Sequence, residues 1–191
     1  MTQPKTEVYV TGGAGLIGSF LCEILNKNGY KVIVVDDFSK GSINNLSSCL
    51  SDLEIIEADL QNYNQAQKAL GKAKIIYHLA SRAYGVGYSI DHHIETLIHN
   101  ELITNNLLKI SQNNELNEIL LTSSACVYSD DGPDIISEKY DFHGDPELAN
   151  EGYGLAKRQL ETKFKLLAKV KNIDLKIIRP FNIYGERYKW V

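Results

Sequence analysis

The chain has 191 residues, of which 43% are hydrophobic and 23% are charged, and its formal net charge is −4. This balance is typical of a globular protein, and the length predicts one domain over residues 1–191. A weakly acidic chain without a basic cluster is not expected to bind nucleic acid or a membrane surface, so any phosphate must be held by local geometry. The chain has neither the apolar stretch of a signal peptide nor a run that could span a membrane, so we expect a cytoplasmic protein.

Short apolar runs alternate with longer amphipathic stretches along the chain. We predict strands over residues 7–11, 31–35, 53–57, 75–79, 118–122 and 175–179, and helices over residues 16–28, 63–70, 91–111 and 153–170. Strands that alternate with helices are joined by crossover connections, which make the strands parallel and place helices on both faces. The pattern therefore predicts an α/β protein with a doubly wound parallel sheet, the Rossmann fold.

The first predicted strand leads into a glycine-rich turn, Thr11-Gly-Gly-Ala-Gly-Leu-Ile-Gly18, which opens the first helix. Gly12, Gly15 and Gly18 have the spacing at which such turns let the backbone approach a pyrophosphate and pack the helix tightly on the strand. The helix N-terminus adds free N–H groups and a partial positive charge for the phosphates. Because the turn lies between a predicted strand and a predicted helix, we interpret it as a dinucleotide-binding motif.

Asp36 follows the second predicted strand. A carboxylate at this point can accept hydrogen bonds from both hydroxyls of the adenosine ribose, and it repels a 2′-phosphate. The alternative is an Asp that only starts the turn over residues 36–41. We predict that the cofactor is NAD and that NADP binds at least about tenfold more weakly.

A tyrosine and a lysine begin the last predicted helix, in the sequence Tyr153-Gly-Leu-Ala-Lys157. Positions i and i+4 lie on one helix face, so the lysine can lower the pKa of the phenol, which would then accept a hydroxyl proton. Ser124 follows the fifth predicted strand at the carboxyl edge of the sheet, where ligands of this fold bind. We predict that Ser124, Tyr153 and Lys157 are catalytic.

With these motifs in place, the whole chain resembles the extended short-chain dehydrogenase/reductase family, the NAD-dependent epimerase/dehydratase group that acts on nucleotide sugars. The resemblance also covers Ala58-Asp-Leu60, His78-Leu-Ala80, Asn100, Thr122-Ser-Ser-Ala-Cys-Val-Tyr128 and Arg179-Pro-Phe-Asn-Ile-Tyr-Gly185. It implies a cofactor-binding set of Gly12, Gly15, Leu16, Ile17, Gly18, Asp36, Asp59, Leu60, Ala80, Asn100, Tyr153 and Lys157. It implies a substrate-binding set of Tyr84, Gly85, Ser124 and Asn182, with Asn182 on the substrate diphosphate. Ala80 and Asn100 could instead only pack or cap.

Cys126 narrows the choice within the family by resemblance. Dehydratases and decarboxylases of the family usually have Glu at this position, whereas the segment around Cys126 resembles GDP-mannose 3,5-epimerase and GDP-fucose synthase, which use Cys as an acid/base. Cys126 lies two residues after Ser124, so in an extended segment both side chains would point to the same side, and nearby positive charge would lower the thiol pKa. The alternative is a packing residue. The other cysteines, Cys22 and Cys49, are distant in sequence, so we expect no disulfide framework and no metal site.

These features predict an NAD-dependent epimerase of a GDP- or UDP-linked nucleotide sugar, which oxidises C4 transiently. A dehydratase, reductase or decarboxylase of the same family, or a catalytically silent NAD-binding module, stays open as an alternative. Members of the family continue beyond the position of Val191 into a region that encloses the sugar nucleotide, so we expect either a fragment or a shortened protein, one that binds NAD without appreciable turnover.

The two long helices predict a homodimer, because they carry apolar residues on more than one face and members of the family pair such helices into a four-helix bundle. The apolar positions are Leu97, Ile98, Leu102, Ile103, Leu107, Leu108, Leu160, Phe164 and Leu167.

Overall fold

The computed structural model of the chain describes residues 5–133, 135–140 and 142–187. Its strands form one parallel sheet in the order β3-β2-β1-β4-β5-β6. They are β1 (Glu7–Thr11), β2 (Lys31–Asp36), β3 (Glu54–Glu57), β4 (Ile75–His78), β5 (Glu118–Thr122) and β6 (Asp174–Ile178). This order confirms the predicted doubly wound fold. The chain reverses direction across the sheet between β1 and β4, and ligands of such folds bind at the carboxyl ends of the strands on either side of this point.

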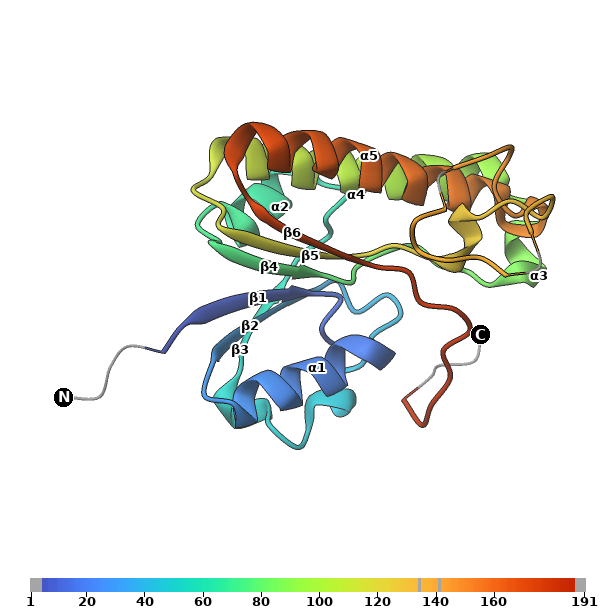
Figure 1. Cartoon of the computed structure of the whole chain (residues 1–191). Coiled ribbons are helices and arrows are strands. Elements are labelled where there is room, and N and C mark those ends of the chain that lie inside the picture. Colours follow the sequence, from blue (N-terminus) through green and yellow to red (C-terminus); the bar gives the residue numbers. More distant parts are fainter. Residues whose placement is uncertain (1–4, 134, 141, 188–191) are drawn as a thin grey trace.

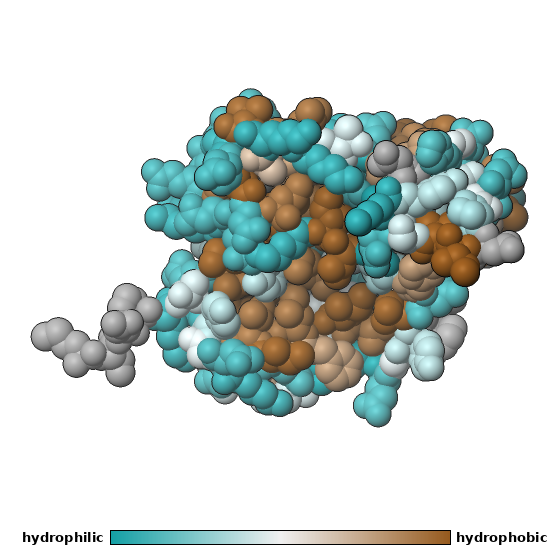
Figure 2. Space-filling model, in the orientation of Figure 1, coloured by the Kyte–Doolittle hydropathy of each residue, from teal (hydrophilic) through white to brown (hydrophobic). Residues whose placement is uncertain are grey.

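Both faces of the sheet are covered, which explains the unbroken apolar run of β2. Val32 and Val34 pack with α1 on one face, whereas Ile33 and Val35 belong to the apolar core under the other helices. A strand that is buried on both faces needs apolar residues at every position. Figure 2 shows apolar residues gathering across the middle of one face of the molecule, where the sheet lies, with hydrophilic residues above and below.

The helices form two layers, one on each side of the sheet (Figure 1). Helix α1 (Leu16–Lys27) lies on one side, and α2 (Tyr63–Leu70), α4 (His93–Asn113) and α5 (Glu151–Lys171) lie on the other, where α4 and α5 run side by side. Within the described ranges, no helix is both long enough and apolar enough to cross a membrane.

Differences from the predicted elements are confined to their ends and to short turns. Helix α4 begins and ends two residues later than predicted, and α5 begins at Glu151 instead of Tyr153. The short helix α3 (Val86–Ser89) and the 3-10 turns η1 (Ile43–Leu46), η2 (Leu50–Asp52), η3 (Ala125–Val127) and η4 (Leu148–Asn150) were not predicted. Such one-turn elements are too short to produce an apolar period in the sequence.

Candidate functional site

A cleft of about 290 Å³ opens at the carboxyl ends of β1, β2 and β4, at the point where the strand order reverses. Its size is at the lower end of the range of small-molecule sites. Nine residues predicted to bind the cofactor line it: Gly12, Gly15, Leu16, Ile17, Gly18, Asp36, Asp59, Leu60 and Ala80. The fold therefore brings together in one cleft motifs that are distant in sequence.

The glycine turn forms the floor of this cleft. Gly12 has φ +68, and a Cβ there would lie 2.7 Å from the backbone nitrogen of Ala80, so the turn and the end of β4 meet with no room for a side chain. A Cβ at Gly15 would lie 3.2 Å from the carbonyl oxygen of Gly12. Helix α1 starts here with no side-chain cap and no acidic residue in its first turn, so its first N–H groups are available to an anion.

The ends of β1 and β4 are joined by a buried hydrogen-bonded pair. Thr11 Oγ1 lies 2.7 Å from His78 Nδ1 and accepts a hydrogen bond from the Ala80 backbone nitrogen at 3.3 Å. Burial lowers the pKa of His78 to about 3, so the imidazole is neutral and its Nδ1 can accept the hydroxyl proton of Thr11. This pair fixes the backbone of Ala80 against the glycine turn.

Asp36 ends β2 with its side chain almost fully buried. One carboxylate oxygen accepts a hydrogen bond from the Ala14 backbone nitrogen and the other from that of Phe38, each at 2.9 Å. Burial raises the pKa of this carboxyl, although the two N–H groups oppose the shift. Each oxygen retains a further lone pair, so the carboxylate is held in place and can still accept hydroxyl protons from a ligand in the cleft.

Tyr153 and Lys157 lie on the inner face of α5, and each contacts a residue that lines the cleft. The Tyr153 hydroxyl lies 3.3 Å from Ser81 Oγ, and Lys157 Nζ donates to the carbonyl oxygen of Thr122 at 2.7 Å. The lysine nitrogen is 5.4 Å from the centre of the tyrosine ring. The predicted pairing of the two side chains on one helix face is therefore present.

The predicted lowering of the phenol pKa is not produced by the protein's own residues. Burial raises the pKa of Tyr153 to about 12, opposed by the hydrogen bond with Ser81, and burial lowers the pKa of Lys157 to about 8. Desolvation disfavours the charged form of each group, and it is the largest cause of both shifts. At neutral pH the protein thus holds a protonated phenol beside an ammonium group.

Ser124 and Cys126 lie where β5 meets α5, but their predicted side-by-side arrangement on an extended segment is wrong. Residues Ala125–Val127 form the turn η3, and Ser124 Oγ caps it by accepting from the Cys126 backbone nitrogen at 3.2 Å. The turn therefore interrupts the alternation of side chains that an extended segment would have. A Cβ at Gly154 would clash with the Cys126 carbonyl oxygen, so this glycine lets α5 pack directly on the turn.

The predicted lowering of the Cys126 pKa is also contradicted. Burial and the hydrogen bond with Glu147 raise the pKa of the thiol to about 11. The positive charge of Lys157 does not offset the cost of burying a thiolate. Cys126 is therefore a neutral thiol at physiological pH.

The other predicted site residues surround the cleft without lining it. Asn100 on α4 accepts from the Arg82 backbone nitrogen at 2.9 Å and donates to the Arg82 carbonyl oxygen at 3.0 Å, so it holds the loop after β4. Tyr84 and Gly85 continue that loop, with the Tyr84 hydroxyl 2.9 Å from His99 Nδ1. Asn182 is exposed, next to a residue of the cleft wall, Ile183.

Several residues of the site were missed by the sequence reasoning. Thr122 ends β5, and Ser81 and Arg82 lie in the loop that follows β4, so their place at the carboxyl edge of the sheet was a usable signal. Arg187 gave no such signal. It reaches the cleft from the segment after β6, paired with Glu23 and with its guanidinium carbon 3.9 Å from the centre of the Phe20 ring.

The sequence matches a known protein family and several known proteins. The model of the NAD dependent epimerase/dehydratase family matches residues 8–189. A UDP-N-acetyl-alpha-D-glucosaminuronate decarboxylase of Bacillus cytotoxicus is 29% identical over 97% of this chain, and a putative UDP-glucose 4-epimerase of Methanocaldococcus jannaschii is 30% identical over 94% of it. The chain spans 57% of the length of each of these two relatives.

Solved structures show the same architecture. A UDP-glucose 4-epimerase of Thermotoga maritima, crystallised with UDP-glucose, superposes with a TM-score of 0.83 at 26% identity. The match covers 95% of this chain and 57% of that structure.

Proposed function

We propose that this chain, which belongs to the NAD dependent epimerase/dehydratase family, binds NAD and is the cofactor-binding part of a nucleotide-sugar epimerase. One observation carries the proposal: the glycine turn and Asp36 line the same cleft, and the Tyr153 hydroxyl contacts Ser81 in the wall of that cleft. The cofactor site and the proton-transfer group are therefore adjacent, as coupled hydride and proton transfer requires.

The residues of the cleft fit a dinucleotide. The turn packs too closely at Gly12 and Gly15 for a side chain, and the N–H groups at the start of α1 are available to bind an anion. Asp36 can accept the hydroxyls of the adenosine ribose. Thr122 lines the cleft, and its Oγ1 is buried with no hydrogen-bond partner among the residues that the structure describes.

NAD, when bound, supplies a hydride acceptor that can later return the hydride. We propose that Tyr153 Oη takes the C4 hydroxyl proton of the sugar as the hydride leaves the same carbon. The phenol proton must first be lost to solvent; the Lys157 ammonium would then stabilise the phenolate, and Ser81 Oγ would donate a hydrogen bond to it. Ser124 would bond the reacting oxygen, and the substrate would lie against Tyr84, Gly85 and Asn182.

A decarboxylase of a UDP-linked sugar acid is the second candidate, because the Bacillus cytotoxicus relative is named as one. The residue that favours the epimerase is Cys126, which stands where family decarboxylases usually carry a glutamate. As a half-buried neutral thiol, Cys126 is suited to return a proton to C3 or C5 after another base has removed one next to a C4 ketone, and it is poorly suited to be that base. We propose this acid role for it.

We also propose a homodimer. Ile94, Ile98 and Leu102 form one exposed stripe on α4, with 70%, 50% and 43% of their surface accessible. Four residues of the predicted dimer face, Ile103, Leu107, Leu160 and Phe164, are instead part of the core, so the partner would cover the remaining outer face of α4 and α5.

Calorimetric titration with NAD tests the cofactor proposal directly. We expect saturable binding that Gly12→Val abolishes, because a branched side chain cannot occupy the position next to Ala80. Absence of NAD binding by the folded chain would refute the proposed function.

The reaction is tested by incubating the protein that contains these residues with UDP- and GDP-sugars and following the products by NMR. Inversion at a ring carbon supports the epimerase, and release of carbon dioxide from a UDP-uronic acid supports the decarboxylase.

A further inference from the structure

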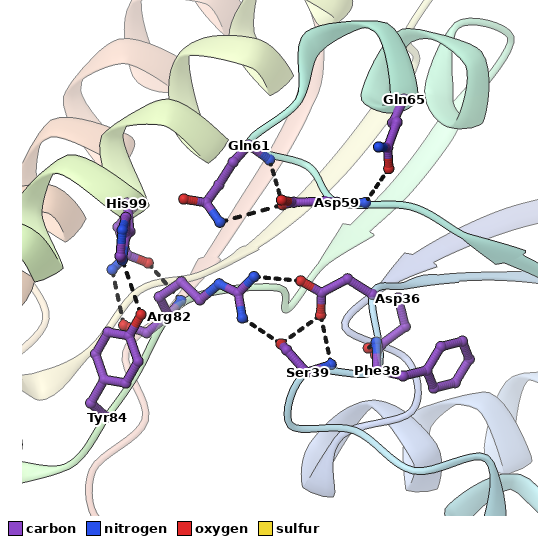
Figure 3. A network of polar contacts seen from close by, with 11 residues as sticks. Asp36, Phe38, Ser39, Asp59, Gln61, Gln65, Arg82, Tyr84 and His99 are labelled. Atoms are coloured by element: carbon purple, nitrogen blue, oxygen red, sulfur yellow. Dashed lines mark hydrogen bonds and ion pairs between the residues drawn. The ribbon is translucent and has the colours of Figure 1, made fainter.

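An arginine bridges the two loops that border the cleft. Arg82, on the loop after β4, lies 2.6 Å from Asp37 through Nη2 and donates to Ser39 Oγ through Nη1. Asp37 in turn accepts from the Ser39 backbone nitrogen at 3.0 Å and from its hydroxyl at 2.6 Å. Figure 3 shows Arg82 reaching across to Ser39 on the loop after β2. The guanidinium is thus engaged by partners from the neighbouring loop.

This bridge lies beside the carboxylate that we propose binds the adenosine ribose. Asp36, Asp37, Ser39, Lys40 and Arg82 all line the same cleft. The charge of Arg82 reaches Asp36, since it opposes the burial effect on the pKa of that carboxyl. Lys40 Nζ donates to the Ala83 carbonyl oxygen, which holds the second cation at this edge.

Two cations next to a ribose site are the groups that recognise a ribose phosphate. A guanidinium binds phosphate oxygens with two parallel hydrogen bonds, and cofactors of this class differ only in the 2′-phosphate of the adenosine ribose. In this chain the guanidinium already has an acidic partner. A phosphate would have to compete with Asp37 for Arg82 and would also meet the negative charge of Asp37 itself.

We propose that Asp37 is a second determinant of cofactor choice, which acts through Arg82 by masking an anion site for the 2′-phosphate of NADP. The inference rests on the proposed NAD function and extends it. Asp36 selects for the free ribose hydroxyls, while Asp37 prevents the nearby cations from stabilising a bound 2′-phosphate. Asp37 is a positioning residue, and its effect is specific for ligands that carry the 2′-phosphate.

The test compares NAD and NADP affinities by calorimetry in Asp37→Asn. The substitution keeps the side-chain size, and the amide oxygen can still accept the hydrogen bonds from Ser39. We expect the ratio of the NADP to the NAD dissociation constant to fall about tenfold, because Arg82 gains a charge-assisted bond to the phosphate. NAD affinity should change by less than about threefold. A merely structural role of Asp37 would weaken both cofactors alike.

Two further variants identify the group that acts. Arg82→Gln added to Asp37→Asn should return the ratio to the wild-type value. Glu101→Gln is the matched control, since it removes an acid from the Lys163 pair, whose side chains are 25% and 29% exposed, and it should leave the ratio unchanged. If repulsion from Asp36 keeps NADP binding below detection, the same comparison is made in Asp36→Asn, where we expect the same tenfold effect.

An unchanged ratio in both backgrounds, or a change that persists after Arg82→Gln, would overturn the proposal while leaving NAD binding intact. Failure of the folded wild-type chain to bind NAD would instead refute the proposed function and this inference with it.

Discussion

We predict that the buried charge of Lys157, a proposed catalytic residue, lowers the stability of the folded protein. Its side chain is 3% exposed and makes one hydrogen bond, to the Thr122 carbonyl oxygen at 2.7 Å. Burial lowers its pKa from 10.5 to about 8. Between these two pH values the unfolded chain binds a proton that the folded chain has lost, so the stability of the protein rises with pH.

The size of the effect is set by the pKa difference. At about 1.4 kcal/mol per unit, the charged lysine costs the folded state about 3 kcal/mol at pH 7, and about 2 kcal/mol of this cost is removed by pH 9.5. The variant Lys157→Met has no charge to bury and loses one hydrogen bond worth about 1 kcal/mol. We therefore expect Lys157→Met to be about 2 kcal/mol more stable than wild type at pH 7, and nearly equal to it at pH 9.5.

Urea unfolding followed by far-ultraviolet circular dichroism, with a reductant present and at several pH values from 7 to 9.5, measures this difference. Comparing the variant with wild type at each pH cancels the other titrating groups. Lys169→Met removes an exposed ammonium from the same helix and reports any general effect of losing one positive charge. A stability difference that does not shrink as the pH rises would show that the buried charge is not its cause. NAD affinity should fall in Lys157→Met, which would make this lysine a residue kept for function at the expense of stability.

Other substitutions test the remaining features of the structure. Gly18→Ala places a Cβ against the carbonyl oxygen of Gly12, so NAD affinity measured by calorimetry should fall at least about tenfold; unaltered affinity would contradict the tight packing of the turn. Glu161→Ala should cost about 3–5 kcal/mol in urea unfolding, because it leaves the guanidinium of Arg179 unpaired at 10% exposure. Burial opposes ionisation of Glu161, but hydrogen bonds led by that from Arg179 hold its pKa low, so wild type should lose this stability as the pH falls through that value, whereas Glu161→Ala should not. Cys126→Ala should retain NAD binding and abolish deuterium incorporation at C3 or C5 of the sugar in the protein that contains these residues; undiminished exchange would leave Cys126 a packing residue. Leu102→Glu should convert a dimer into a monomer by light scattering, and a wild-type monomer at micromolar concentration would refute the proposed assembly.

The fold and the cofactor motif were readable from the sequence because they depend on neighbours along the chain. Strands such as β2 show their burial as a continuous apolar run, and helices such as α1 show their ends through an Asn-Gly stop. The glycine turn and Asp36 could be proposed as a cofactor motif because a strand, a turn and a helix are consecutive, and backbone geometry constrains residues that are close together in the chain. The reversal between β1 and β4 then places both motifs in one cleft.

The ionisation of the proposed catalytic groups was decided only by the tertiary structure. The spacing of Tyr153 and Lys157 shows that they share a face of α5, but their pKa values depend on burial among segments far away in sequence. The turn η3 at Cys126 likewise forms where β5 meets α5, and one 3-10 turn leaves no periodic signal.

The contacts between the loops around the cleft also could not be predicted from the sequence. Arg82 and Asp37 belong to loops after different strands, β4 and β2. The two loops meet because only one strand, β1, lies between β2 and β4 in the sheet. A sequence pattern predicts local structure and motifs made by residues that are close together in the chain. Contacts between distant loops, and the burial that sets the charge of a side chain, arise only when the sheet brings its strand ends together.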